Sequence, residues 1–499
     1  MSIARVFFWI MKLTARLLLK LLHLLLRAAI TRRKRRRTYG TARWASWFSM
    51  LKAGILSRKG IIVAHICGRF IRYRGDGAVL VYAPMGAGKT SGLVLPALLD
   101  RSRRSVICTD PKGELFAIAG RWRQTLGPVW RLDALHPETS HRLNPLDLIR
   151  VGTHHEADDA AMIADLLVLS ESSDQHWDSS AKQLITALIR HTLHSFPPEL
   201  RTLSTIRELI ANEGEALTDL LQAMAQSPLP SVAEEGRVTL ASLGSPEMTS
   251  VIKNTAKAMA FWSKDRIGGM LTSDSDFTFL NMHRKTKTVF ICVPEDKLTV
   301  YRPFLRMMMG CALAAAVRGK DYPTPKCKPL LLIDECPALG YLEALASGLG
   351  YLRAYARVLL VFQDLGQLKR IYGPQGARTF MAAAGCQVAF NVNDNETAQE
   401  LADSIGRTTV LATTRGRSRT GRMPWDEREN QSESEAGRDL LDAAEIRRLH
   451  PMRCIVLITG RMPILAWKVR HFRVRHWRKR WDDAWRARGQ PPAPAPMSS

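Results

Sequence analysis

Closely spaced cysteines are missing from this 499-residue sequence, which has eight cysteines and no C-x-x-C pair. Cys327 lies in an expected loop, and the other seven lie mostly in apolar runs: Cys67, Cys108, Cys292, Cys311, Cys336, Cys386 and Cys454. Disulfide frameworks and structural zinc sites need cysteines at regular, paired spacings. We therefore expect reduced cysteines in the core of a cytosolic protein, and neither disulfides nor zinc ligands.

Acidic residues are missing from the start of the chain, where none precedes Asp76. The stretch from Val6 to Ile30 is mostly apolar, but basic side chains interrupt it at helical spacing. They are Arg5, Lys12, Arg16, Lys20, His23 and Arg27. At about 100° per residue these six positions form one stripe of a helix. A charge at the centre of a bilayer costs roughly 2.5–3.5 kcal/mol, so the stripe argues against a membrane-spanning helix.

The six consecutive basic residues from Arg32 to Arg37 follow this helix. Such a cluster binds anionic headgroups, at about 1 kcal/mol for each charge. We therefore expect residues 1–37 to form an amphipathic basic segment that lies on the anionic cytoplasmic face of a membrane. The alternative is an amphipathic helix that docks on a partner protein.

Basic residues exceed acidic ones throughout, and the formal net charge is +26. A large positive charge favours polyanions, so we expect DNA to bind independently of its sequence. Basic residues also dominate the end of the chain, from Lys468 onward. For residues 476–499 we expect a basic helix followed by a disordered Pro-rich tail.

The most informative motif runs from Ala78 to Leu99 and reads AVLVYAPMGAGKTSGLVLPALL. A β-branched run, a glycine-bearing loop and an apolar helical segment follow one another, as in a phosphate-binding P-loop. Nucleotide would contact Gly86, Ala87, Gly88, Lys89, Thr90 and Ser91. Lys89 would reach the β- and γ-phosphates, and the Thr90 hydroxyl would bind Mg²⁺. Ala83 stands where the P-loop pattern has its first glycine, which is tolerable if its φ is negative.

A second motif strengthens the first. The apolar run Leu330–Ile333 ends in Asp334-Glu335, which predicts a buried strand with carboxylates at its carboxyl end. Asp334 would hold Mg²⁺ through water, and Glu335 would orient and deprotonate the attacking water. The two motifs together predict hydrolysis of ATP, with Mg²⁺, on an α/β fold.

Three further residues are candidates for catalysis. Gln363 ends the apolar run Val358–Phe362, where a side chain can sense the γ-phosphate. Arg353 and Arg357 precede that run, and in a ring one of them could enter the neighbour's site as an arginine finger. Each of the two could equally be an ordinary surface arginine. Asp110, after Val106–Thr109, could face Mg²⁺ or simply form a turn.

Short apolar runs separated by helical stretches predict a doubly wound, mostly parallel sheet. We expect its strands at Ile61–Ala64, Val79–Tyr82, Val106–Thr109, Val289–Val293, Leu330–Ile333, Val358–Phe362, Val388–Phe390 and Ile455–Ile458. Residues 156–269 lack such runs and predict an inserted all-α domain. The nucleotide-binding domain would then comprise residues 38–155 and 270–475. Within it, the polar stretch Thr413–Gly437 is expected to be an exposed loop or arm.

From about Tyr39 to Arg473 the chain resembles the coupling-protein ATPases of type IV secretion and conjugation, the TraG/TraD-like group. The resemblance rests on TYGTARWAS, GLVLPALL, SVICTDPKGELFAIAGRWR, RLNPLDLI, HWDSSAKQLITALIRH, LLLIDECPALG, LLVFQDLGQL, NETAQELADSIGRTTV and IVLITG, in that order. It implies a RecA-like P-loop motor with an inserted all-α domain, usually a hexamer, at the bacterial inner membrane. Such a motor recruits a relaxase–DNA complex or protein effectors to the secretion channel. Family members commonly begin with two membrane-spanning helices, and this chain departs from them there.

Two other functions compete with an ATP-driven coupling protein. One is a double-stranded DNA translocase of the FtsK/HerA kind, against which the expected all-α insertion and TYGTARWAS argue. The other is a membrane docking platform that binds nucleotide without hydrolysing it. Single-turnover ATP hydrolysis with and without DNA would separate the platform from the two motors.

Overall fold

The computed structural model describes residues 38–168, 175–319, 327–419 and 427–482. These form two compact units, one containing residues 398–446 with the segment up to Trp44, and the other containing residues 45–397 and 447 onward. The expectations for residues 1–37 and for the Pro-rich tail lie outside the described residues. Among the helices that are described, none has the length and apolar character needed to cross a membrane.

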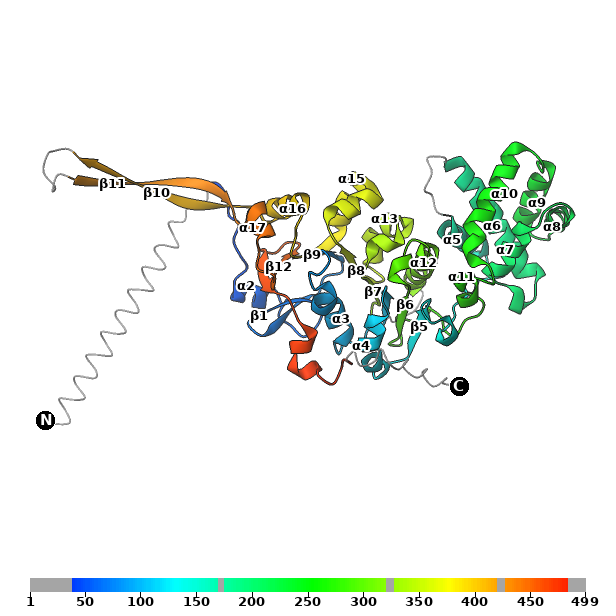
Figure 1. Ribbon diagram of the computed structural model, residues 1–499, viewed down its shortest axis with the longest axis horizontal. Helices are drawn as coiled ribbons and strands as arrows, with labels where there is room; N and C mark the ends of the chain where they lie inside the picture. The colour runs from blue at the N-terminus through cyan, green and yellow to red at the C-terminus, as the bar shows by residue number, and fades with distance from the viewer. Residues whose placement is uncertain (1–37, 169–174, 320–326, 420–426, 483–499) are drawn as a thin grey trace. The chain divides into compact units, whose positions relative to one another are not determined.

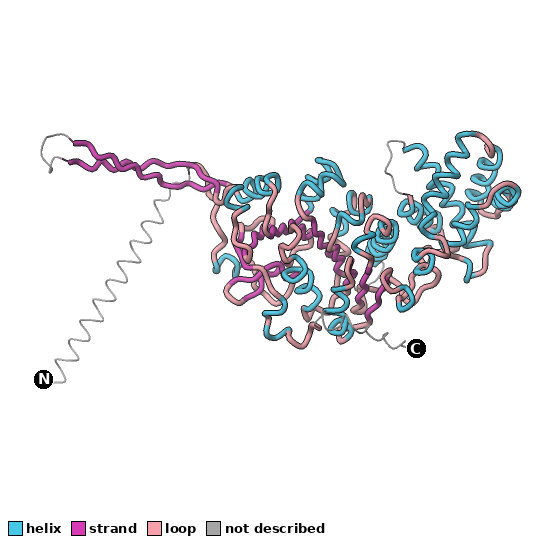
Figure 2. The backbone as a smooth tube through the Cα atoms, in the orientation of Figure 1, coloured by secondary structure: helices cyan, strands magenta, loops and turns pink. Residues whose placement is uncertain are grey.

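The larger unit is built on an eleven-stranded sheet, drawn in magenta in Figure 2. Its strand order is β2-β1-β13-β12-β9-β3-β8-β7-β4-β6-β5. Neighbouring strands are parallel from β9 to β5 and antiparallel from β9 to β2. The strands are β1 (Ile61–Ile66), β2 (Arg69–Tyr73), β3 (Ala78–Tyr82), β4 (Val106–Asp110), β5 (Val129–Asp133), β6 (Thr288–Cys292), β7 (Leu330–Ile333), β8 (Arg357–Phe362), β9 (Ala384–Phe390), β12 (Arg453–Ile458) and β13 (Ile464–Trp467).

Both faces of this sheet are buried, as the continuous apolar runs of its strands require. Along β3, Leu80 and Tyr82 pack into one core, whereas Val79 and Val81 pack into the other. The core of Val79 and Val81 includes α3 (Leu95–Leu99) and α4 (Glu114–Gln124). The opposite core includes α12 (Arg302–Arg318) and α15 (Leu365–Ala383), the latter kinked at Gly373 and Pro374. Helices on both faces confirm the predicted α/β fold (Figure 1).

All secondary structure described between residues 156 and 271 is helical. The α-helices are α5 (Glu156–Leu167), α6 (Gln175–Ser195), α7 (Leu203–Ala211), α8 (Glu215–Ala225), α9 (Pro230–Ala241), α10 (Pro246–Met259) and α11 (Ile267–Leu271). Their core is continuous with the sheet face that α12 covers. Short helices complete this unit: α2 (Trp47–Lys52), α13 (Glu343–Ala346) and α14 (Leu349–Leu352). The domain boundaries drawn from the sequence stay a prediction.

The smaller unit contains an antiparallel hairpin of β10 (Arg407–Arg419) and β11 (Glu427–Asp439), paired without interruption from Arg407↔Asp439 to Arg419↔Glu427. The polar stretch expected as a loop or arm is therefore a two-stranded arm. The unit also contains most of α16 (Asn395–Ile405) and most of α17 (Ala443–Arg447). Sequence reasoning missed β2, β5 and this pairing, because these strands carry polar residues and lack a continuous apolar run. It also missed β13, although its four residues, ILAW, are all apolar.

The end of the described chain differs from the basic helix expected from residue 476. Arg475–Trp477 forms a short 3₁₀ turn, η10, and no α-helix follows in the residues described up to 482. Trp477 is buried and stacks on Phe70, with ring centroids 5.2 Å apart. Anchoring this indole in the core fixes the local chain path. The four-residue spacing of Trp477 and Trp481 therefore does not mark an α-helix here.

Candidate nucleotide-binding site

Three adjacent strands bring the predicted site residues together. β3, β8 and β7 are neighbours and run parallel, so their carboxyl ends meet at one edge of the sheet. The P-loop follows β3, Gln363 follows β8, and Asp334-Glu335 follows β7. Ligands of open α/β sheets bind outside this carboxyl edge. The sheet topology thus gathers segments that are more than 240 residues apart in the sequence.

The P-loop has the backbone conformation that glycine permits. Gly86 and Gly88 have φ angles of 74° and 81°, in the left-handed region that side chains disfavour. Ala83 is fully buried and is not among the described non-glycine residues with positive φ. Its amide N–H donates to the Phe362 carbonyl of β8, with N and O 2.8 Å apart. Alanine therefore fits the first position of the loop, as expected for a negative φ.

Lys89 joins the P-loop to the acidic motif. Its ammonium donates to Glu335 Oε2 at 2.7 Å and lies 3.9 Å from Asp334 Oδ1. Gln363 Nε2 lies 3.5 Å from the other oxygen of Glu335. The backbone N–H of Gln363 donates to Gln367 Oε1 at 2.9 Å, which fixes the start of the turn after β8. The Lys89 ammonium, the two carboxylates and the Gln363 amide therefore lie close together at this edge of the sheet.

Asp334 is a buried carboxylate whose hydrogen bonding is incomplete. It is 7% exposed, and its Oδ1 accepts no hydrogen bond from the described residues. Burial raises the pKa of Asp334 to about 7, although the nearby Lys89 ammonium lowers it. The backbone N–H of Asp334 donates to Thr109 Oγ1 of β4 at 2.9 Å, which holds the motif in place. A buried oxygen without a donor fits a group that receives a hydrated cation.

Thr90 and Ser91 begin the helix after the P-loop. Thr90–Val94 forms a π-helical turn, η1, which continues directly into α3. Ser91 Oγ donates to the Gly88 carbonyl at 3.2 Å, and the Gly92 N–H donates to the same carbonyl at 2.8 Å. Both bonds tie the helix start to the loop, so Thr90 stands at the mouth of the phosphate cradle.

Asp110 forms the turn that was one of its two expected roles. It is buried at the end of β4, and its Oδ2 accepts the Phe116 N–H at 2.9 Å. Backbone N–H groups of Leu115 and Lys112 also face this carboxylate, while burial raises the pKa of Asp110 to about 6. The carboxylate therefore satisfies the start of α4.

Arg353 and Arg357 lie away from this chain's own site. Arg357 begins β8, at the amino edge of the sheet, and donates to the carbonyls of Gly75 and Arg74 at 3.0 and 3.1 Å. Arg353 is exposed, and its carbonyl accepts from Lys328 Nζ at 2.8 Å. Whether either enters a neighbouring subunit's site stays a prediction.

Lys468 is a site residue that sequence reasoning missed, because it appeared as one basic residue in a basic tail. It is 4% exposed and donates to the P-loop carbonyl of Ala87 at 2.8 Å. It also donates to Asn391 Oδ1 at 2.8 Å. No local sequence signal separates this buried lysine from the exposed arginines that follow it, Arg473 and Arg475.

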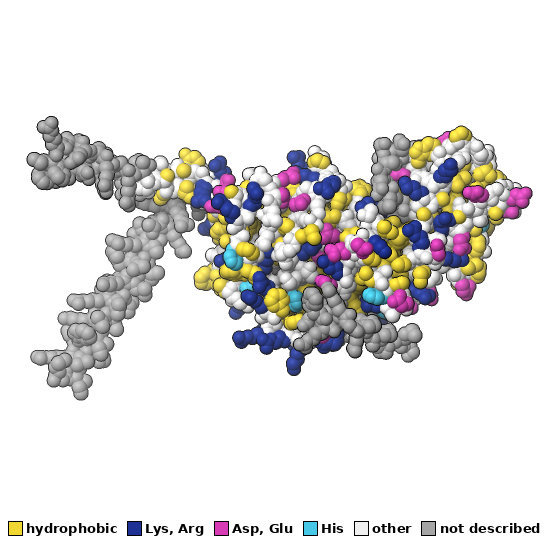
Figure 3. All heavy atoms as spheres, in the orientation of Figure 1, with side chains coloured by type: hydrophobic (Ala, Val, Ile, Leu, Met, Phe, Trp, Pro, Cys, Tyr) yellow, Lys and Arg dark blue, Asp and Glu magenta, His cyan; other side chains and the backbone are white. Residues whose placement is uncertain are grey.

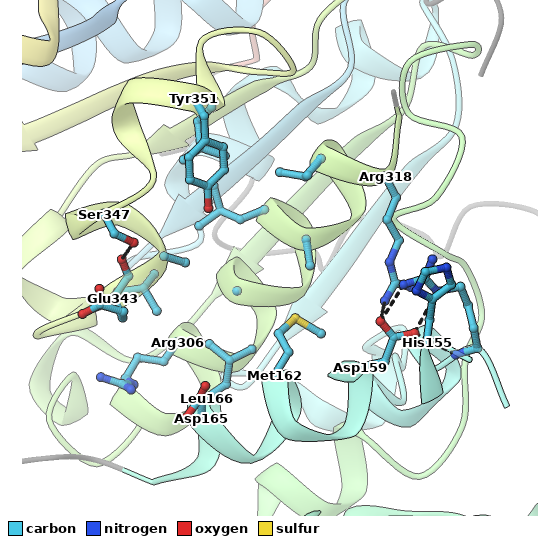
Figure 4. Close-up of a pocket in the computed structure, with 18 residues that line it drawn as sticks. His155, Asp159, Met162, Asp165, Leu166, Arg306, Arg318, Glu343, Ser347 and Tyr351 are labelled. Carbon is cyan, nitrogen blue, oxygen red and sulfur yellow. Dashed lines mark hydrogen bonds and ion pairs between the residues drawn. The ribbon is translucent and has the colours of Figure 1, made fainter. Parts of the chain in front are cut away.

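A separate cavity of about 560 Å³ lies between α5, α12 and the α13–α14 region (Figure 4). Gly310, Leu313 and Ala314 of α12 line it, and the ion pair of Arg318 with Asp159 lies at its border. None of the predicted nucleotide residues lines this cavity. The P-loop edge of the sheet therefore remains the candidate nucleotide site.

The fold and this edge together define a P-loop NTPase of the α/β class. The family model described as "Type IV secretory system Conjugative DNA transfer" matches residues 43–492. The chain belongs to that family, which confirms the predicted resemblance.

Curated relatives agree with this family assignment. Protein VirD4 of Rhizobium radiobacter is 30% identical over 478 residues, covering 92% of this chain and 67% of the relative. Protein VirD4 of Agrobacterium fabrum is 30% identical, covering 87% and 66%. Conjugal transfer protein TraG of Escherichia coli is 29% identical, covering 76% and 66%. The chain thus spans about two thirds of the length of these relatives.

Solved structures share the fold. The unbound bacterial conjugative coupling protein TrwBdeltaN70 superposes with a TM-score of 0.67 at 18% identity, covering 87% of this chain and 95% of that one. The plasmid coupling protein TrwB in complex with ADP and Mg²⁺ gives a TM-score of 0.63 at 18% identity, covering 87% and 94%. The RecA-like architecture implied by the sequence resemblance is confirmed.

Proposed function

We propose that this chain is an ATP-driven coupling protein. It recruits a relaxase–DNA complex or a protein substrate to a type IV secretion or conjugation channel and powers its transfer. The observation that carries the proposal is the convergence of Lys89, Glu335 and Gln363 on three adjacent parallel strands, in a member of a conjugative DNA transfer family. The relatives named VirD4 and TraG, and the structures named coupling protein, support it.

The site's residues fit ATP with Mg²⁺. The backbone of Gly86, Ala87 and Gly88 would cradle the phosphates, and Lys89 would bind their terminal oxygens. Thr90 and Asp334 would hold Mg²⁺, which neutralises phosphate charge when bound. The TrwB structure in complex with ADP and Mg²⁺ supports the binding of a nucleotide together with Mg²⁺.

Lys89 and Glu335 restrain each other in the structure. The Lys89 ammonium lies 2.7 Å from Glu335 Oε2 and so occupies this oxygen of the carboxylate. Phosphate oxygens would draw Lys89 away and leave Glu335 free to accept a proton from the attacking water. Gln363, beside Glu335, would orient that water. Nucleotide binding would in this way release Glu335 to act as the general base.

The partners follow from charge and family. Lys and Arg side chains gather along the lower edge of the face in Figure 3, and Arg475, Arg478 and Lys479 of the last described segment are exposed. We propose sequence-independent binding of DNA, alongside relaxase or effector proteins and channel components. We further propose a ring, a homohexamer, held at an anionic membrane surface on the cytoplasmic side of the bacterial inner membrane.

ATP hydrolysis by the full chain, with and without DNA, tests the proposal. We expect DNA-stimulated turnover, no turnover by Lys89→Ala, and nucleotide binding without turnover by Glu335→Gln. The matched controls are Lys264→Ala and Glu208→Gln, which break an exposed ion pair in the helical region, with N and O 2.8 Å apart. Wild-type turnover by Glu335→Gln would show that another base activates water, and no hydrolysis by the wild type would favour the docking platform.

A further inference from the structure

The lysine beneath the P-loop has an unusual environment. Lys468 directly follows β13 and is buried, and its Nζ lies 4.7 Å from the centroid of the Phe390 ring. Its two hydrogen-bond acceptors are Ala87 O and Asn391 Oδ1, both at 2.8 Å. Asn391 follows β9 with a φ of 47°, a conformation that asparagine tolerates better than most side chains. A buried ammonium is costly unless it is paired, so its place here requires an explanation.

The carbonyl that Lys468 holds belongs to the peptide unit between Ala87 and Gly88. In a planar trans peptide the C=O and the following N–H point in opposite directions. Because the Ala87 carbonyl points toward Lys468, the Gly88 N–H points in the opposite direction within the peptide plane, away from Lys468. In a P-loop, inward-pointing N–H groups of this kind bind phosphate oxygens. Gly88 has a φ of 81°, and glycine is the residue that adopts this conformation at least cost.

The residues after Lys468 pack against the helix that the P-loop begins. A methyl group on Gly92 would lie 3.2 Å from the Val469 carbonyl, so the two backbones are in close contact. The side chain of His471 forms a hydrogen bond with the backbone of Ser91. Arg480 Nη1 donates to the Leu99 carbonyl at 2.9 Å, at the carboxyl end of α3. The C-terminal segment thus contacts the helix at both of its ends.

We propose that Lys468 is a positioning residue of the nucleotide site, which orients the Ala87–Gly88 peptide so that the Gly88 N–H faces the phosphates. The inference deepens the proposed function and rests on it. The ammonium acts through the backbone of the loop and touches no phosphate. Its positive charge behind the loop also favours an anion in front of it.

The protonation of Lys468 adds a second signature. Burial lowers the pKa of Lys468 to about 8; the nearby Cys454 thiol raises it, and Arg470 lowers it. The other titratable neighbour is His65, which bonds to the backbone of Lys468. A bound polyphosphate stabilises the charged ammonium, so binding should favour the protonated lysine. The affinity for nucleotide should then fall as the pH rises from 7.5 to 9.5.

The test measures binding of a fluorescent ADP analogue, mantADP with Mg²⁺, to the full chain. The variants are Lys468→Met, Lys468→Arg and the control Arg470→Met. Arg470 is two residues away and bonds to Met452 Sδ rather than to the P-loop. Loss of one charge-assisted hydrogen bond predicts on the order of a tenfold weaker affinity for Lys468→Met. Arg470→Met should bind within about twofold of the wild type, and Lys468→Arg should restore part of the affinity.

Measurements at several pH values distinguish a role of Lys468 in orienting the P-loop from a role in stabilising the fold alone. The wild type and Arg470→Met should bind mantADP more weakly at pH 9.5 than at pH 7.5, whereas Lys468→Met should show a smaller change. Lys468→Met binding as tightly as the wild type would overturn the inference and leave the proposed function standing. If Lys468→Met fails to fold, a pH-independent affinity of the wild type overturns it instead. A wild type that binds no mantADP refutes the proposed function itself.

Discussion

Replacing Asp334 with asparagine should stabilise the nucleotide-free protein. Burial raises the pKa of this carboxyl from 3.8 to about 7. Each tenfold change in an ionisation constant is about 1.4 kcal/mol, so ionising Asp334 in the folded state costs about 4 kcal/mol more than in the unfolded chain. The asparagine amide pays no such charge penalty, but it must still be desolvated. We therefore expect a gain of about 2 kcal/mol in the free energy of unfolding at pH 8.

The sign of this effect depends on pH. Below pH 3.8 the carboxyl is protonated in both states, so its ionisation costs nothing. Between pH 3.8 and about 7 the folded protein holds the proton while the unfolded chain releases it, and stability falls as the pH rises. Above about pH 7 the cost is complete and constant. At pH 5.5 the ionisation cost is only about 2 kcal/mol, so the advantage of Asp334→Asn should nearly vanish there.

Urea unfolding of the full chain at the two pH values measures the difference. Asp296→Asn is the matched control, because Asp296 is exposed and should change stability little. MgADP should stabilise the wild type and stabilise Asp334→Asn far less, because the carboxylate that we propose to hold Mg²⁺ is gone. A variant less stable than the wild type at pH 8, or an advantage that does not shrink at pH 5.5, would refute the reasoning.

Three further predictions concern assembly, DNA and the membrane. Mixing Lys89→Ala subunits with Arg353→Ala subunits should restore part of the ATP hydrolysis if Arg353 acts across a ring; Arg357→Ala should fail to complement, because carbonyls hold Arg357. Binding of a DNA duplex should weaken steeply between low and physiological salt through counterion release, and a flat dependence would rule out phosphate contacts. Deleting residues 1–37 should abolish sedimentation with anionic vesicles while leaving mantADP affinity unchanged; continued sedimentation would place the membrane contact elsewhere.

Motifs that combine a local backbone conformation with a specific chemistry could be predicted from the sequence. The P-loop from Gly86 to Thr90 and the Asp334-Glu335 pair after an apolar run are of this kind. The P-loop and the Asp334-Glu335 pair then lie at the same edge of the sheet, because the carboxyl ends of parallel strands meet there. The missed strand Arg69–Tyr73 carries two arginines among its five residues, so it gives no continuous apolar run.

The sequence by itself determined the α/β class, the residues of the P-loop and the family of the chain. Those depend on local order along the backbone and on motif spacing. Only the tertiary structure decided that Lys89 pairs with Glu335, that Arg357 lies at the opposite edge of the sheet from the P-loop, and that Lys468 is buried under the P-loop. A lysine has the same formal charge and the same secondary-structure propensity whether it lies in an exposed basic tail or in a core, so the sequence alone does not show its burial. Which of the two it occupies depends on strand order and packing between segments 381 residues apart.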